Sequence, residues 1–390
     1  MTTLYLLEPA EPGDAWAPFT GARPLAELRA GAWLIRERWA GVLGGLEVAA
    51  ILGTHVLEFD DTGSPPVAPP TPVEGPAIVA ASWFAPAGTP VELAPETRRL
   101  VHDGATVAWI VPAGESWDGA EDRNGREQAV DGLALHGTYD LVTALEHFLV
   151  PDCADFLAEP GDPVPDGCIV LGDPGELVLL GATVEPGVVF DVRHGVVVLE
   201  DGVQVRSGTR LEGPLYVGAG TLLLGGQVRH SAIGPQCRVH GEVSASVFLG
   251  YANKSHDGFL GHSVLGHWVN LGAGTITSNL KNTYGEVRLD LPGGRIATGR
   301  TNLGSLLGDH AKTAIGTLLP TGCVVGAGAS VFGGGAVPKH VAPLTWGEGD
   351  ARLGADGLVT IASRVMPRRG IEFTASREAS LRALHRRLSA

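Results

Sequence analysis

A repeat of six residues is the feature of this chain that most restricts its fold. Between about residues 168 and 349, apolar residues recur at every sixth position, often followed by glycine. Two runs show the period: Leu199, Val205, Leu211, Val217 and Leu223, and then Leu319, Val325, Val331 and Val337. Short strands joined at glycine corners are typical of a parallel β-helix, whose apolar side chains point into a narrow prism. A β-sandwich would instead show period-two alternation over longer strands.

The repeat is interrupted once and is followed by a tail. Residues 277–302 break the period, and we expect them to leave the prism as an extended loop. The tail at 361–390 includes a basic amphipathic helix that begins at Ser376. Its two alternative roles are to pack on the prism and to contribute arginines to an anionic ligand.

The N-terminal part alternates between strand-like and helix-like segments. We predict strands over 3–8, 48–52, 77–82 and 106–111, and helices over 22–39, 95–103 and 140–159. This order favours an α/β domain, followed by a linker at 161–167. We therefore expect an α/β domain over 1–160, a β-helix over 168–349 and a helical tail over 350–390.

Composition limits the partners and the compartment. The formal net charge of −15 makes a nucleic-acid partner unlikely, because no excess of cations exists to displace phosphate counterions. No apolar run approaches the ~18 residues needed for a membrane span. Widely spaced Cys153, Cys168, Cys237 and Cys323 are expected to be buried thiols in a reducing compartment. We expect a cytoplasmic protein without a membrane or nucleic-acid partner.

A prism of stacked hexads resembles the left-handed β-helix acyltransferases. The resemblance implies a homotrimer that binds acyl-coenzyme A in the cleft between neighbouring prisms. Acyl transfer to an amine or hydroxyl needs a general base, and histidine suits that role near neutral pH. The histidines of the repeat region are the candidates: His240, His256, His262, His267 and His310.

One segment narrows this choice by resemblance. The sequence HDGFLGHSVLGHWVNLGAGTITSN is similar to the acetyltransferase core of the bifunctional bacterial enzymes that make UDP-N-acetylglucosamine. The similarity implies that His256 is the general base and that Asn270 and Asn279 contact an amino sugar phosphate. It also implies that the backbone of Ala273 and Gly274 lies near the thioester of acetyl-CoA.

The resemblance extends over most of the chain to a divergent branch of these enzymes. The segments ARPLAELRAG, YANKSHDGFLG, NLKNTYG, LTWGEG and RVMPRRG carry it. This branch is described as UDP-N-acetylglucosamine diphosphorylase/glucosamine-1-phosphate N-acetyltransferase or sugar nucleotidyltransferase. It implies a nucleotidyltransferase-like, Rossmann-like N-terminal domain in front of the left-handed β-helix.

Other polar residues of the segment have alternative interpretations. Lys254 and Lys281 either bind the sugar phosphate or form solvated surface; the phosphate-binding lysine of the best-studied enzyme falls on Gly285 here. Asp257 either orients an imidazole or caps a turn. His310 is the alternative base. We expect His240, His262 and His267 to face solvent.

The N-terminal loop departs from the pattern of the best-studied nucleotidyltransferases. Such enzymes hold nucleotide phosphates with a glycine-rich loop and a lysine. The loop EPAEPGDAWAPFTGARPLAELR has few glycines and offers arginines instead. By resemblance to the divergent branch, Arg23, Glu27 and Arg29 are the candidates for nucleotide binding. Mg²⁺ is expected if this domain is active, but the sequence reveals no acidic metal ligand.

Three functions follow from these observations. The first is N-acetyl transfer from acetyl-CoA to glucosamine 1-phosphate, fused to a domain that uses a nucleoside triphosphate to make a UDP-sugar. The second is nucleotidyl transfer alone, with UTP or dTTP, in which the β-helix only forms the trimer. The third is a non-catalytic trimer that binds a sugar nucleotide.

Overall fold

The computed structural model describes residues 2–70, 72–119 and 125–389. Its N-terminal part is built on a seven-stranded sheet with the order β12-β9-β10-β7-β1-β4-β5. Strand β1 pairs in parallel with β4 and β7, whereas β10 runs antiparallel to β7 and β9. The strands are β1 (Thr3–Leu7), β4 (Val48–Leu52), β5 (Val67–Ala68), β7 (Ala77–Ala81), β9 (Thr97–His102), β10 (Ala105–Val111) and β12 (Arg126–Ala129). The predicted α/β class is confirmed.

Short hairpins and two helices complete this part. The minor strands are β2 (Arg29–Ala30), β3 (Trp33–Leu34), β6 (Val73–Glu74), β8 (Phe84–Pro86), β11 (Ser116–Trp117) and β13 (Gly132–Ala134). Helix α1 spans Ile35–Val42 and α2 spans Asp140–Asp155. The helix predicted over 22–39 was mostly wrong, because Gly31 turns the chain with a φ of 70° between β2 and β3.

The helix predicted over 95–103 was also wrong. These residues form β9, which pairs with β10 through a tight hairpin. Asp103 and Gly104 lie at the turn with φ values of 47° and 77°. Asp-Gly favours the turn type that needs two positive φ angles, so this dipeptide determined the local structure more strongly than helical spacing.

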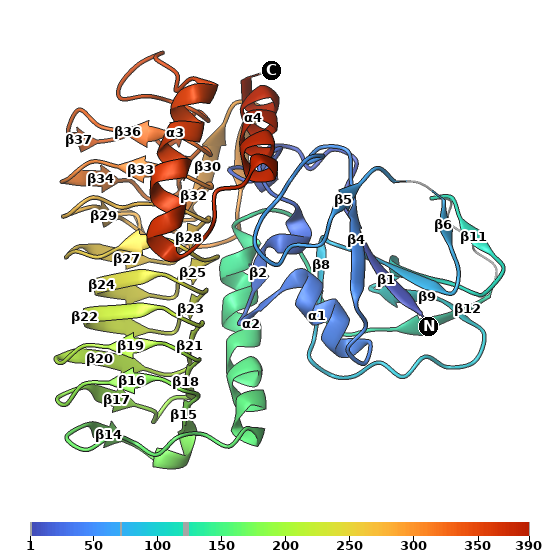
Figure 1. Cartoon of the computed structure of the whole chain (residues 1–390), viewed down its shortest axis with the longest axis horizontal. Helices are drawn as coiled ribbons and strands as arrows, with labels where there is room; N and C mark the ends of the chain where they lie inside the picture. The colour runs from blue at the N-terminus through green and yellow to red at the C-terminus, as the bar shows by residue number, and fades with distance from the viewer. Residues whose placement is uncertain (1, 71, 120–124, 390) are drawn as a thin grey trace.

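The second part is the parallel β-helix that the hexad repeat predicted (Figure 1). One of its faces is a nine-stranded parallel sheet, which rises through every coil. The strands of this face are β15 (Leu177–Leu179), β18 (Val197–Leu199), β21 (Leu215–Val217), β23 (Ala232–Ile233), β25 (Val247–Phe248), β28 (Val264–Leu265), β32 (Ser305–Leu307), β35 (Cys323–Val325) and β38 (His340–Val341). Leu199, Val217 and Ile233 are registered partners on successive coils, and all are fully buried. The hexad positions therefore form the interior stack.

The other faces include the two longest strands of the prism, β22 with 8 residues and β24 with 7. The break at 277–302 leaves the prism as an antiparallel hairpin. The hairpin strands are β30 (Arg288–Leu291) and β31 (Gly294–Ala297). The remaining strands of the prism are β14 (Ile169–Leu171), β16 (Thr183–Val184), β17 (Val189–Asp191), β19 (Gln204–Val205), β20 (Thr209–Glu212), β22 (Leu222–Arg229), β24 (Arg238–Ser244), β26 (Asn253–Lys254), β27 (Phe259–Gly261), β29 (Ile276–Thr277), β33 (Lys312–Thr313), β34 (Thr317–Leu319), β36 (Ser330–Val331) and β37 (Gly335–Ala336).

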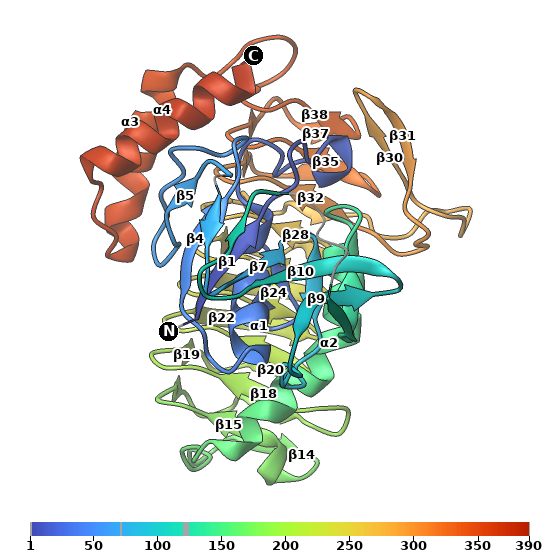
Figure 2. The same ribbon diagram turned by 90° about the vertical axis from the view of Figure 1, so that its right-hand side faces the viewer.

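The two parts share one hydrophobic core. Helix α2 stands along the prism in Figure 1, beside the face that begins with β15. Leu145 and Phe148 of α2 belong to the same buried cluster as Val198, Tyr216 and Val247 of the prism. Figure 2 shows the N-terminal sheet in front of the coils. The prism therefore supports the N-terminal domain along most of its length.

The tail forms two helices, α3 (Ala355–Val365) and α4 (Ala375–Ser389), joined by a 3₁₀ turn at Met366–Arg369. The predicted helix near Ser376 is confirmed. Arg387 of α4 donates hydrogen bonds to the carbonyl oxygens of Gly21 and Leu57, so the end of the chain contacts its beginning. None of the helices in the described part combines the length and hydropathy that crossing a membrane demands.

All four cysteines are free thiols, as expected. Cys153, Cys237 and Cys323 are buried, whereas Cys168 is only half-buried.

Candidate functional site

His256 lies at an exposed corner of the prism, between β26 and β27. The next residue, Asp257, contacts His240 of the preceding coil, with 3.2 Å between Oδ1 and Nδ1. Asp257 therefore pairs with a neighbouring histidine and not with His256. An exposed imidazole at a corner is free to approach a ligand that lies along the outside of the prism.

Ala273 and Gly274 lie on the coil that follows His256 and stack against the same corner. The Gly274 backbone N–H donates to the Asp257 carbonyl oxygen at 3.1 Å. Gly258, whose φ is 135°, packs so tightly here that a Cβ would lie 2.2 Å from the Thr275 carbonyl oxygen. Only glycine fits this approach, so the two coils hold the backbone of Ala273 beside the His256 turn.

Lys254 occupies an interior position of the prism, where its registered partner on the preceding coil is Val239. Its side chain is buried, and Nζ donates 2.7 Å hydrogen bonds to the carbonyl oxygens of His240 and His256. Burial lowers the pKa of Lys254 to about 8. The ammonium group thus links two corners of the prism from inside. This position is neither the solvated surface nor the phosphate contact that the sequence suggested for Lys254.

Asn270 lies on the outer side of the face that carries β26. Its Oδ1 accepts a 2.8 Å hydrogen bond from Asn253 Nδ2 on the preceding coil. Backbone bridges link Asn253 to Asn270 and Asn270 to Lys312, so the three residues form a column. Asn253 is three residues before His256, which puts the column within roughly 10 Å of the corner along the strand.

Asn279 is at a different corner. Its amide Nδ2 lies 2.8 Å from Nδ1 of His262, at the opposite end of β27 from His256. His262 was expected to face solvent, but it is half-buried, and burial lowers its pKa. Lys281 donates to the Glu286 carbonyl oxygen inside the excursion. Within one chain, Asn279 and Lys281 therefore do not line the column that contains Asn270.

The three nucleotide candidates of the N-terminal domain are all buried. Glu27 pairs with Arg36 at 2.6 Å, and burial raises its pKa. Arg29 donates to the Ala32 carbonyl oxygen and lies over the Tyr216 ring of the prism. In this arrangement the side chains contribute to packing, and their assignment to nucleotide binding stays a prediction.

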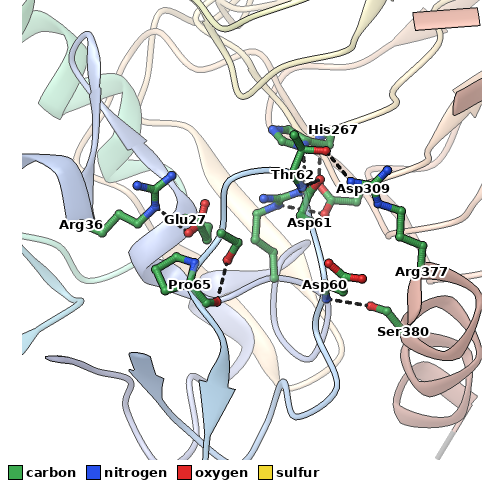
Figure 3. Close-up of polar contacts among 12 residues, drawn as sticks. Glu27, Arg36, Asp60, Asp61, Thr62, Pro65, His267, Asp309, Arg377 and Ser380 are labelled. Atoms are coloured by element: carbon green, nitrogen blue, oxygen red, sulfur yellow. Dashed lines mark hydrogen bonds and ion pairs between the residues drawn. The ribbon is translucent and has the colours of Figure 1, made fainter. Parts of the chain in front are cut away.

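Arg23 connects the two parts of the molecule. It is 1% exposed, and it pairs with Asp61 at 2.6 Å and with Asp309 of the prism at 2.9 Å. Figure 3 shows Asp61, His267 and Asp309 in one cluster, in which His267 Nδ1 lies 2.7 Å from Asp61. The expectation that His267 faces solvent was wrong. Burial alone would raise the pKa of Asp61, but His267 and Arg23 hold it far below its usual value.

His310, the alternative base, is buried against Trp268, with ring centroids 6.4 Å apart. Burial lowers its pKa to about 3, so the ring is neutral and enclosed. His256 is thus more accessible than either His267 or His310. Sequence reasoning missed Lys312 and Arg238, which lie near Asn270, because neither belongs to a recognisable motif.

Metal binding has little support from the described geometry. Within residues 2–70, 72–119 and 125–389, no three His, Cys, Asp or Glu side chains are grouped as a metal site. Asp61 is engaged by Arg23 and His267.

Residues 6–158 match the family model described as sugar nucleotidyl transferase. The chain is similar to the bifunctional sugar-1-phosphate nucleotidylyltransferase/acetyltransferase of Sulfurisphaera tokodaii, with 33% identity over 159 residues, or 38% of this chain and 38% of that protein. It is also similar to the bifunctional protein GlmU of Methanococcus vannielii, with 29% identity over 100 residues, or 26% of this chain and 24% of that protein. For the bifunctional protein GlmU of Methanocaldococcus jannaschii the identity is 33% over 85 residues, or 22% of this chain and 21% of that protein. The chain thus spans well under half the length of each of these relatives. Together with the family match, these similarities describe a GlmU-like protein.

Proposed function

We propose that this GlmU-like chain transfers an acetyl group from acetyl-CoA to the amine of glucosamine 1-phosphate at the His256 corner. The observation that carries the proposal is the exposed His256 beside the backbone of Ala273 and Gly274. The name of the Sulfurisphaera tokodaii relative, which joins nucleotidylyltransferase and acetyltransferase, supports the same assignment.

In the proposed reaction, the amine nitrogen attacks the thioester carbonyl carbon and His256 accepts a proton from that nitrogen. The C–S bond then breaks, and coenzyme A leaves as a thiolate that takes up a proton. Asn270 and Asn279 contact the amino sugar phosphate. Because they lie at different places on one chain, we propose a homotrimer in which neighbouring prisms bring these residues together.

The test is acetyl transfer to glucosamine 1-phosphate, measured by release of free thiol. His256→Ala is expected to lower kcat by 10²-fold or more, the usual contribution of a general base. His136→Ala, on an exposed loop of the N-terminal domain, is the matched control and should retain full activity. A wild type that binds acetyl-CoA without histidine-dependent transfer would refute the proposal.

The family match over residues 6–158 favours a second activity, nucleotidyl transfer to a sugar 1-phosphate. A nucleoside triphosphate would be its second substrate, and Mg²⁺ would be its metal cofactor. Pyrophosphate release across UTP, dTTP, ATP and GTP tests this activity separately from acetyl transfer. Release with no acetyl transfer would leave the prism as an assembly module, and the absence of both would favour a non-catalytic sugar-nucleotide binder.

A further inference from the structure

A cavity of about 390 Å³ lies between the face that carries Asn270 and the turn that follows α3. Figure 1 shows α3 alongside the coils from β28 to β36. Coils of the prism and the Met366–Arg369 turn both contribute polar side chains to the lining. These are Arg238, Asn253, Asn270, Lys312, Arg368 and Arg369.

The four cations of this cavity lack acidic partners. Arg238 donates to the carbonyl oxygen of Cys237 at 2.8 Å, and Lys312 to that of His310 at 3.0 Å. In the part of the chain that the structure describes, none of the four forms an ion pair with a carboxylate. The chain has a net charge of −15, so its carboxylates outnumber its cations. A shortage of carboxylates therefore does not explain why the cations around this cavity are unpaired.

The positive charges also oppose one another. Burial and then the charges of Arg238 and Arg368 lower the pKa of Arg369. The Arg369 Nε atom is buried and has no hydrogen-bond partner. Burial lowers the pKa of Lys312 to about 8. A buried donor without a partner is costly, and an anion in the cavity would satisfy the donor and relieve the repulsion.

The other walls suit a ligand larger than a simple ion. Tyr251 and Trp268 line the cavity with stacked rings whose centroids are 4.5 Å apart. Asn253 and Asn270 add amide groups that both donate and accept hydrogen bonds. The volume is within the usual range for small-molecule pockets. The ligand therefore combines an anionic group with a polar or flat body.

We propose that this cavity binds a phosphate ester, held by Arg369, Arg368, Lys312 and Arg238. Guanidinium groups recognise phosphate through paired hydrogen bonds, and four cations exceed what a single carboxylate would require. Two sources share this chemistry: the sugar 1-phosphate and the phosphates of coenzyme A. The choice between them rests on the proposed function, whereas phosphate binding itself does not.

Calorimetric titration of the full chain tests the site without turnover. The probes are glucosamine 1-phosphate, glucosamine, coenzyme A and 3′-dephospho-coenzyme A. Arg369→Gln and Lys312→Gln should each raise the Kd for a phosphate ester by roughly tenfold or more, as expected for a lost charge-assisted hydrogen bond. Arg369→Lys should recover part of the affinity. Arg364→Gln, on the exposed side of α3, is the matched control and should bind like the wild type.

The probes separate the two sources. If the two variants lose affinity only for glucosamine 1-phosphate, the cavity binds the acetyl acceptor. If they lose affinity only for coenzyme A, the cavity binds the acetyl donor. A smaller loss with 3′-dephospho-coenzyme A places the 3′-phosphate in the cavity. Each of these outcomes supports the site.

The result that overturns the proposal is unchanged affinity in both Arg369→Gln and Lys312→Gln, or no binding of any phosphate ester by the wild type. His256→Ala should bind the phosphate ester normally. If binding depends on Arg369 but no acetyl transfer occurs, the proposed function fails and the phosphate site stands. If transfer occurs and both cavity variants bind normally, the proposed function stands and the phosphate site fails.

Discussion

Lys254 donates a 2.7 Å hydrogen bond to the carbonyl oxygen of His256 from inside the prism. A second bond of the same length reaches the carbonyl oxygen of His240, one coil earlier. A charged group in an apolar interior costs stability unless its hydrogen bonds offset the loss of water. Lys254 therefore holds the backbone of His256, the proposed base, in place.

Replacing Lys254 by methionine should reduce acetyl transfer without unfolding the prism. Methionine has a similar length and suits the apolar stack next to Val239. It cannot hold the His256 turn, so we expect kcat to fall roughly tenfold while the melting temperature stays the same or rises. Lys339→Met, which removes a partly exposed lysine near Asp290, is the control. Wild-type kcat in Lys254→Met would show that the ammonium does not position His256.

The lowered pKa of Lys254 predicts that stability depends on pH. The pKa of Lys254 is about 8 in the folded protein and 10.5 in its ordinary state. Between these values the unfolded chain binds more protons, so the free energy of unfolding gains a contribution that grows with pH. Relative to Lys254→Met, the wild type should become more stable as the pH rises from about 8 to 10.5. Denaturant unfolding at pH 7, 8.5 and 10 measures the difference, and a constant or falling value contradicts the assignment.

Arg23 should contribute strongly to stability. Arg23→Met leaves Asp61 and Asp309 buried without their cation, which typically costs about 3–5 kcal/mol. Arg295→Gln breaks the exposed pair with Asp290 and should cost less than about 1 kcal/mol. Chemical denaturation of both variants compares the two losses. Similar small losses would mean that solvent reaches the Arg23 cluster.

His310 should make the protein sensitive to acid. Its pKa is about 3 in the folded chain and 6.5 in its ordinary state. Below pH 6.5 the unfolded chain takes up a proton that the folded chain does not, so stability falls by about 1.4 kcal/mol per pH unit toward pH 3. In His310→Asn this pH dependence is lost, and asparagine tolerates the φ of 61° at this position. The advantage of the wild type over the variant should shrink between pH 7 and pH 4.5, and parallel curves would contradict the enclosed neutral ring.

The period of six made the prism predictable, because each coil repeats a local requirement for one interior apolar side chain. The same period also indicates the position of Lys254. This lysine lies six residues before Leu260, which is buried, so the repeat places both side chains inside the prism. The charge of Lys254 instead favoured a phosphate contact or a solvated surface position. In β9, the Asp103-Gly104 turn was the missed signal.

The pairing of Arg23 with Asp309 was beyond prediction from one sequence, because no local pattern relates residues 286 positions apart. The cavity beside Asn270 likewise depends on contacts between residues that are far apart in the sequence. Its cations come from separate coils and from the tail, and only the fold brings them together.

For the tail arginines, the sequence left packing and ligand binding open. Packing is confirmed, because Leu381 and Leu384 of α4 share a buried cluster with Trp268 of the prism. Ligand binding by a tail arginine stays a proposal, which the position of Arg369 in the cavity supports.

The Arg23 cluster also bears on the order in which the chain can complete its fold during synthesis. Ribosomes add about 5–20 residues per second, so Arg23 waits roughly 15–60 s for Asp309 to be made. The contacts of Arg387 with Gly21 and Leu57 form later still. The N-terminal domain is therefore fully packed only after the prism and helix α4 have been translated. Until then, a nascent chain keeps the surface around Gly21, Arg23 and Leu57 uncovered.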